Sequence, residues 1–204
     1  METKAWQLGS PGTLLYRFYD RLREGLNHRL VHFLIGNAIG RDNCNVLEAG
    51  SGPAFASSIL RTERRIRLSI AVDIDMEALL EAQRRDRALA LVLADVQALP
   101  FHSETIDLCW NSSTLEHLDA PERALHEMKR VARPGGMIFV GVPNSYGPLG
   151  FQRWVADTAV GIWIGKTFNS TQLMGMLSKI GLMPVHCIFY FFRFFVGVLA
   201  QKAS

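Results

Sequence analysis

Cysteine is scarce in this chain of 204 residues, which contains only Cys44, Cys109 and Cys187. An odd number of widely spaced cysteines argues against a disulfide-stapled scaffold and against a zinc site built from paired cysteines. Histidine, aspartate and glutamate form no group with metal-ligand spacing either, so we expect no metal. Each cysteine lies in or beside an apolar run, which favours buried, reduced thiols and a cytoplasmic location.

An excess of charge of one sign is also lacking, since 22 lysines and arginines stand against 19 aspartates and glutamates. In residues 61–67 and 81–87 the basic side chains are accompanied by acids, as on the solvated faces of helices. No basic run is interleaved with aromatic residues, the pattern typical of nucleic-acid-binding surfaces. We therefore expect no nucleic-acid partner.

No apolar run has the features of a signal peptide or of a clear membrane span. Residues 1–6 lack the charged-then-apolar pattern of a signal peptide. Residues 182–200 approach the ~20 residues that a spanning helix needs. However, a proline, a histidine and an arginine interrupt this run, and aromatic and β-branched residues dominate it. We expect two strands here, 184–192 and 195–201, folded against each other.

The most informative feature present is an apolar run at residues 46–49 that carries Glu48 and leads into Gly50, Ser51 and Gly52. Glycine supplies the positive φ angles and the bare backbone that a tight strand-to-helix turn needs when a ligand lies against it. This pattern predicts a turn that cradles a cofactor.

Polar side chains follow three further apolar runs, at the point where each run ends. They are Asp73, Asp95 and Asn111. Open α/β sheets bind their ligands at the carboxyl ends of the strands, so we expect these side chains to lie around one site. Asp73 also follows Gly52 by about 20 residues, the separation at which an acid on the second strand reaches ribose hydroxyls.

Strands and helices alternate along the whole chain, which predicts a parallel sheet covered by helices on both faces. Strands are expected at 45–49, 68–72, 89–94, 106–110 and 137–142, besides the C-terminal pair. Helices are expected at 12–24, 27–39, 54–61, 76–87, 121–131 and 170–180. We expect the first two helices to cap the edge of the sheet, and residues 143–167 to be irregular.

Five motifs follow one another in the core: residues 46–54, 71–75, 93–101, 106–118 and 127–136. In this order they resemble the class I S-adenosylmethionine-dependent methyltransferases, in particular the small-molecule subgroup that includes the ubiquinone and menaquinone biosynthesis enzymes. The resemblance covers roughly residues 44–142, and five ordered motifs are far more specific than one glycine turn. It implies a Rossmann-like, doubly wound, mostly parallel seven-stranded sheet with a C-terminal antiparallel strand.

By this resemblance, the chain is a single methyltransferase domain, 1–204. It comprises an N-terminal helical cap (1–43), a cofactor-binding core (44–142), an insertion that is a candidate lid (143–169) and a C-terminal helix with a strand pair (170–204). The implied cofactor is S-adenosylmethionine. The implied cofactor-binding residues are Glu48, Gly50, Ser51, Gly52, Asp73, Ile74, Asp95, Val96 and Asn111.

The resemblance also implies a role for each of these groups. Residues 50–52 would pass beneath the methionine and ribose, with Glu48 near the methionine ammonium or, alternatively, capping a neighbouring amide. Asp73 would accept from both ribose hydroxyls. Ile74 would pack on the adenine, Asp95 and the Val96 amide would address its polar edge, and Asn111 would approach the methionine tail or the transferred methyl.

A catalytic base is harder to identify, because an acceptor that is already nucleophilic needs only positioning and a dry pocket. His117 matches a histidine frequent in the subgroup and is the candidate base, or else it caps its loop. Asp75 is expected to be the N-cap of the following helix. Asp107 lies at the start of a strand, away from the ligand edge, so it is expected to be structural.

The acceptor must be inferred from composition alone. Large apolar side chains crowd the insertion after the fifth strand, which suggests a lid over a small lipophilic acceptor methylated on oxygen, carbon or nitrogen, or a patch for peripheral membrane contact. The alternative is that the segment simply packs as an extra helix. Two other functions are a NAD-binding oxidoreductase, disfavoured because Phe55 stands where its fingerprint needs glycine, and a non-catalytic binding protein of the same fold.

Overall fold

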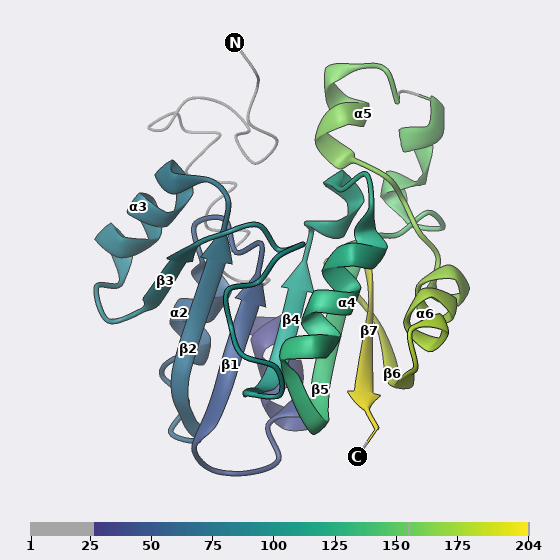
Figure 1. Cartoon of the computed structure of the whole chain (residues 1–204). Coiled ribbons are helices and arrows are strands. Elements are labelled where there is room, and N and C mark those ends of the chain that lie inside the picture. Colours follow the sequence, from purple (N-terminus) through teal and green to yellow (C-terminus); the bar gives the residue numbers. More distant parts are fainter. Residues whose placement is uncertain (1–26, 155, 204) are drawn as a thin grey trace.

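The computed structural model describes residues 27–154 and 156–203. Seven strands form one sheet of order β3-β2-β1-β4-β5-β7-β6 (Figure 1). The strands are β1 (Cys44–Ala49), β2 (Ile66–Asp73), β3 (Ala90–Leu93), β4 (Ile106–Ser112), β5 (Ala132–Pro143), β6 (Leu182–Tyr190) and β7 (Phe195–Lys202). Only β7 runs against the others, lying antiparallel to both β5 and β6. The predicted mostly parallel sheet with a C-terminal antiparallel strand is confirmed.

Helices cover both faces of the sheet, as predicted. On one face lie α2 (Phe55–Leu60), α3 (Met76–Arg85) and a helix that includes residues 27–38. On the other lie α4 (Pro121–Val131) and α6 (Ser170–Lys179). Apolar residues of all the central strands are fully buried between these two layers, because parallel strands alternate their side chains to two covered faces.

The helix at residues 27–38 does not cap an edge, so that expectation was wrong. Its apolar residues Leu30 and Leu34 belong to the same buried cluster as Val46 of β1, Leu108 of β4 and Phe139 of β5. The helix therefore covers the middle of the sheet, where the largest area of apolar strand needs burial. The helix expected at 12–24 lies outside the described residues.

Helix α4 begins and ends where its sequence predicts. Pro121 occupies the first turn, where a backbone N–H would have no intrahelical acceptor, so the missing N–H of proline costs nothing. The negative charge of Glu122 interacts favourably with the positive end of the helix dipole. The buried residues Leu125 and Met128 share one face of the helix. Strand β5 begins earlier than expected, at Ala132, and a register shift opposite β4 accommodates the proline and glycines that follow.

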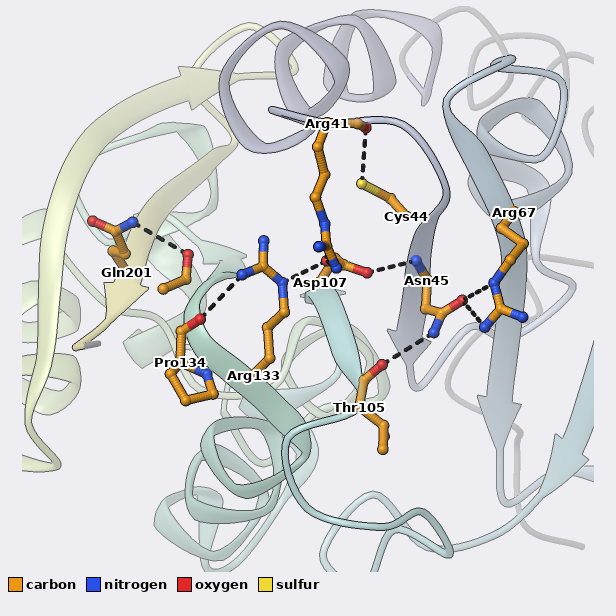
Figure 2. A network of polar contacts seen from close by, with 10 residues as sticks. Arg41, Cys44, Asn45, Arg67, Thr105, Asp107, Arg133, Pro134 and Gln201 are labelled. Carbon is orange, nitrogen blue, oxygen red and sulfur yellow. Dashed lines mark hydrogen bonds and ion pairs between the residues drawn. The ribbon is translucent and has the colours of Figure 1, made fainter.

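A polar network ties together the strand starts at the edge opposite the predicted site (Figure 2). The buried carboxylate of Asp107, on β4, accepts from the Asn45 amide of β1 at 2.8 Å. It also accepts from Arg41 at 2.6 Å and from Arg133 of β5 at 2.5 Å. Burial acts to raise the pKa of Asp107, but these three donors hold it below its usual value. Asp107 is structural in this fold, as expected.

The chain after β5 contains more regular structure than predicted. The insertion forms a 3-10 segment, η2 (Pro148–Trp154), and a short helix, α5 (Ala159–Ile164), which lie beyond the carboxyl ends of the strands (Figure 1). The predicted strand pair is confirmed as β6 and β7. Among the described residues, no helix is long and apolar enough to cross a membrane.

Candidate functional site

The turn after β1 is anchored on the end of β2. The amides of Gly50 and Ser51 both donate to the carbonyl of Val72, at 2.8 and 2.9 Å. Gly50 and Gly52 have φ angles of 80° and 52°, so the expected left-handed glycine turn is present. Ala54, which precedes α2, is also left-handed, with φ 54°. This position suits glycine better than alanine, and the turn is therefore strained at its third small residue.

The two glycines of the turn face different surroundings. A Cβ at Gly50 would collide with the side chain of Thr114, whose hydroxyl donates to the Gly50 carbonyl at 3.0 Å. Gly50 thus lets the turn close against the loop that follows β4. A Cβ at Gly52 would meet no atom of the described residues within 4 Å. The backbone at Gly52 therefore borders open space on the side where a ligand is expected.

Asp73 links the glycine turn to the backbone that precedes α3 through its two carboxylate oxygens. One oxygen accepts from the Gly52 amide at 2.6 Å and the other from the Asp75 amide at 2.8 Å. Each carboxylate oxygen can accept a second hydrogen bond, so both remain competent to bind a ligand hydroxyl. Asp75 accepts from the Glu77 amide at 2.9 Å and caps α3, as predicted.

The ends of β2 and β3 are joined, which brings their polar residues to one place. The Ala94 amide donates to the Asp73 carbonyl at 3.0 Å. Asp95 accepts from the Gln97 amide at 2.8 Å, while the Val96 side chain is buried in the core. Ile74 is 72% exposed, although it is a large apolar residue. An exposed isoleucine between two strand ends is suited to stack on a planar ring.

Glu48 and Asn111 are both buried beneath the turn. Glu48 accepts from the Ser57 hydroxyl of α2 at 2.5 Å, so it ties β1 to that helix. Asn111 donates to the Ala49 carbonyl at 2.6 Å and so ties β4 to β1. The side-chain oxygen of Asn111 is buried and has no hydrogen-bond partner among the described residues. An orphaned acceptor of this kind is costly unless a ligand or water satisfies it.

His117 lies in the loop after β4, within the 3-10 turn η1 (Leu115–His117). Its backbone amide donates to Thr114 at 3.1 Å, but its ring has no hydrogen-bond partner among the described residues. The alternative role as a loop cap through its side chain therefore finds no bond to support it. Desolvation lowers the pKa of His117, so its imidazole is predominantly neutral at neutral pH.

The neighbouring Glu116 was not singled out from the sequence. It is 2% exposed, and one of its oxygens accepts from the Ser113 hydroxyl at 2.7 Å. The other oxygen has no partner among the described residues. Burial raises the pKa of Glu116 to about 8, so the group is largely protonated at neutral pH. In the sequence, only the adjacent Leu115 and the nearby Leu118 hinted at this burial.

A pair of hydroxyl groups next to this loop was also missed. Ser112, the last residue of β4, lies 2.7 Å from the hydroxyl of Tyr190, the last residue of β6. The two residues are 78 positions apart in the chain, so no local pattern indicates their contact. The carboxyl edge thus combines the glycine turn, Asp73, Asn111 and the loop of residues 112–117.

The core sequence matches the family model described as a methyltransferase domain, over residues 47–140. It is 36% identical over 99 residues to malonyl-[acyl-carrier protein] O-methyltransferase of Salmonella typhimurium, covering 48% of this chain and 39% of that protein. It is 27% identical over 143 residues to a probable S-adenosylmethionine-dependent methyltransferase of Mycobacterium tuberculosis, covering 69% and 49%. The chain thus spans about half or less of the length of these relatives.

Solved structures agree on the fold. The 1,6-didemethyltoxoflavin-N1-methyltransferase of Burkholderia thailandensis, solved with S-adenosylhomocysteine, has a TM-score of 0.69 at 18% identity, over 97% of this chain and 94% of that one. A methyltransferase from Aquifex aeolicus gives 0.69 at 15% identity, over 90% and 98%. Residues 47–140 are therefore similar in sequence to a methyltransferase domain, and the chain shares the fold of these solved methyltransferases.

Proposed function

We propose that this chain transfers a methyl group from S-adenosylmethionine to a small, lipophilic acceptor. The observation that carries the proposal is the polar edge built around the glycine turn, where Asp73 supports a bare, open backbone at Gly52. The groups at this edge fit the cofactor. They offer hydrogen-bond acceptors for its hydroxyl and ammonium groups, and an exposed apolar side chain for its adenine ring. When bound, S-adenosylmethionine supplies a methyl already activated on a sulfonium.

Different residues of this edge bind different parts of the cofactor. Asp73 binds the ribose diol through the second lone pairs of its two oxygens. Ile74 stacks on the adenine, and Asp95 accepts from the adenine amino group while the Val96 amide addresses a ring nitrogen. Asn111 offers its orphaned oxygen to the methionine ammonium.

Glu48 and Ser51 are also proposed to lie at the methionine end of the cofactor. Glu48 is a buried carboxyl group that ties β1 to Ser57, and its oxygens are suited to accept from a nearby ammonium. Ser51 contributes backbone between the two glycines, with its amide committed to Val72. Both residues therefore act mainly by fixing the turn on which the methionine portion lies.

His117 is the proposed base where the acceptor is a phenol or an alcohol. A neutral imidazole at neutral pH is ready to accept a proton, and its lowered pKa keeps it in this form. Its ring borders Gly165, so that the insertion and η1 meet at this point. Acceptors that are already nucleophilic need only the positioning that the pocket provides.

The insertion, residues 143–169, is proposed as a lid over the acceptor. Leu149 and Ile164 anchor it in the protein, whereas Tyr146, Phe151 and Ile162 are 85%, 42% and 61% exposed. This division between buried anchors and exposed apolar groups suits a segment that folds onto an apolar molecule. The same exposed groups suit a peripheral contact with a membrane surface, which is the second candidate partner.

A cytoplasmic location remains a prediction, supported by three cysteines that are all free thiols. The function is tested by calorimetric titration of the purified chain with S-adenosylmethionine, S-adenosylhomocysteine and NAD⁺. We expect binding of the first two and none of NAD⁺. Binding of NAD⁺ alone would favour an oxidoreductase. Cofactor binding without transfer to any acceptor in a broad screen would favour a non-catalytic binding protein.

A further inference from the structure

A pocket of about 380 Å³ lies on the face of the sheet covered by the helix at residues 27–38, near the carboxyl ends of the strands. Among the described residues, Arg29 and Leu30 line it from the helix, and residues 188–193 line it from the hairpin that joins β6 to β7. This volume lies within the range of small-molecule sites.

Tyr190 connects this pocket to the proposed methyl-transfer site. From β6, its ring crosses over β7 and β5 to place its hydroxyl 2.7 Å from Ser112, at the end of β4. Two glycines make this crossing feasible. A Cβ at Gly141 would lie 3.1 Å from Tyr190 Cζ, and one at Gly197 would lie 3.3 Å from its Cε1. The bare backbone of β5 and β7 thus makes room for the Tyr190 ring, which lines the pocket and contacts β4 through its hydroxyl.

The charge of the pocket is positive. Arg29 and Arg193 line it, and no acidic residue does so among the described residues. Neither guanidinium has a carboxylate partner in the described part of the chain, and that of Arg193 stacks over the Phe189 ring at 4.7 Å. A guanidinium held by an aromatic face keeps its donors available for an anionic group of a ligand.

The turn that carries Arg193 has a strained backbone, which is stabilised by contacts with Asn144. Phe191, Phe192 and Arg193 all have left-handed backbones, with φ of 57°, 51° and 65°. Each costs of order 1–3 kcal/mol, so surrounding structure must fix them. Asn144 does so, because its side chain donates to the Arg193 carbonyl at 3.1 Å and its amide donates to Phe194 at 2.8 Å. The turn is therefore a preformed feature, of the kind that clusters at ligand sites.

We propose that this pocket binds the acceptor, and that the acceptor is an apolar, ring-sized molecule carrying an anionic group that Arg193 and Arg29 recognise. This inference rests on the proposed methyl transfer and names its substrate class. The aromatic residues of the hairpin enclose the apolar body, and Tyr190 is the lining residue that links the pocket to Ser112 at the carboxyl edge.

The test uses two fluorescent probes that share one ring system. 8-Anilinonaphthalene-1-sulfonate carries an anionic group, and N-phenyl-1-naphthylamine is its uncharged counterpart. Both are titrated into the purified full chain with and without S-adenosylhomocysteine. We expect the anionic probe to bind at least about tenfold more tightly, as a charge-assisted contact implies. Arg193→Gln and Arg29→Gln should each weaken the anionic probe several-fold and leave the neutral one unchanged.

Two further variants serve as controls. Arg193→Lys keeps the charge and should retain most of the affinity for the anionic probe. Arg123→Gln removes an exposed arginine from α4, on the opposite face, and should change nothing. The affinity for S-adenosylhomocysteine should be the same in all variants, which also reports that they are folded.

The possible results separate the two proposals. Equal binding of the two probes, or an unchanged anionic probe in both glutamine variants, overturns the anionic acceptor pocket while cofactor binding leaves the methyltransferase intact. Binding of the probes without S-adenosylhomocysteine binding overturns the methyltransferase instead. A third arm uses vesicles of phosphatidylglycerol and phosphatidylcholine. If the arginines are needed for vesicle binding while the soluble anionic probe does not bind, the pocket is a membrane contact and the proposal fails.

Discussion

At the scale of single residues, the site depends on a few backbone and carboxylate positions that can be tested separately. Gly50 and Gly52 both have positive φ, but within residues 27–154 and 156–203 only Gly50 has a neighbour where a Cβ would lie. Asp73 has both oxygens engaged by backbone amides, and Glu116 has one oxygen engaged and one without a partner among the described residues. These differences separate ligand binding from protein stability.

Gly52→Ala should abolish cofactor binding at a small cost in stability. The new methyl enters open space, so the fold loses only about 1–2 kcal/mol from the left-handed backbone. Gly50→Ala is the matched control, because its methyl would strike Thr114 and should cost clearly more in the free energy of unfolding. Calorimetry and urea denaturation measure the two quantities. If Gly52→Ala bound the cofactor with wild-type affinity, the proposal that the glycine turn lies against the cofactor would be wrong.

Asp73→Ala should weaken S-adenosylmethionine binding by at least about tenfold, because two charge-assisted hydrogen bonds to the ribose are lost. Asp73→Asn retains one acceptor oxygen, so its affinity for S-adenosylmethionine should lie between those of Asp73→Ala and the wild type. Asp75→Ala removes a carboxylate two residues away, which caps α3, and should reduce stability with little effect on affinity. Unchanged affinity in a folded Asp73→Ala protein would remove Asp73 from the site.

Glu116 predicts an unusual dependence of stability on pH. Its pKa is raised to about 8 in the folded chain, compared with about 4.3 in an unfolded one. The folded state therefore binds more protons between these values, and the stability from this group is present below about pH 4 and lost as the pH rises to about 8. Glu116→Gln cannot ionise, so its stability relative to wild type should increase across this range, as urea denaturation would measure. A constant difference would show that Glu116 titrates normally.

At the scale of elements, the insertion and the hairpin surround the carboxyl edge from two sides. The insertion was expected to be irregular, yet it folds into η2 and α5 with two buried anchors. The alternative was that the segment packs as an extra helix on the sheet, but the short helix α5 lies beyond the strand ends instead (Figure 1). Its exposed apolar residues are what the lid proposal uses.

Replacing residues 148–163 with a short Gly/Ser linker should leave cofactor affinity intact but abolish turnover of apolar acceptors. The reason is that the segment carries exposed apolar groups beyond the strand ends and none of the proposed cofactor-binding residues. A milder variant, Tyr146→Ser with Ile162→Ser, removes only exposed apolar surface and should raise KM more than it lowers kcat. Retained turnover in the linker variant would contradict the lid.

At the scale of the whole molecule, the two edges of the sheet have different tasks. The carboxyl edge carries the proposed chemistry, and the opposite edge carries the Asp107 network that joins β1, β4 and β5 (Figure 2). The strand ends at the carboxyl edge contain strained and orphaned groups, which cost stability.

Asp107→Asn should lower the free energy of unfolding by about 1–2 kcal/mol at pH 7, because the Asn45 amide and two partly exposed guanidiniums lose a charged acceptor. The folded pKa of Asp107 is lowered, so its contribution is present above about pH 4 and lost as the pH falls through the folded value. The difference from wild type should therefore shrink in acid. Glu104→Gln, which breaks the exposed pair with Lys202, is the control and should cost under about 1 kcal/mol.

Much of the fold was predictable because its signals are local. Continuous apolar runs marked buried strands, a proline in the first turn marked α4, and glycines marked the turn after β1. The family resemblance added the number of strands and the antiparallel one. The helix at 27–38 was placed wrongly, since an amphipathic pattern predicts that a helix packs but not which part of the sheet it covers.

The sequence by itself determined which side chains follow each strand and where the chain must turn, since these depend on neighbours within a few residues. Tertiary structure alone decided that Asn111 is locked against Ala49 with an orphaned oxygen, that Glu116 is buried, and that Tyr190 crosses two glycines to reach Ser112. Each of these depends on strand order and register between distant segments. Burial, desolvation and hydrogen-bond satisfaction are properties of that packing, which is why the pattern along the chain could not reveal them.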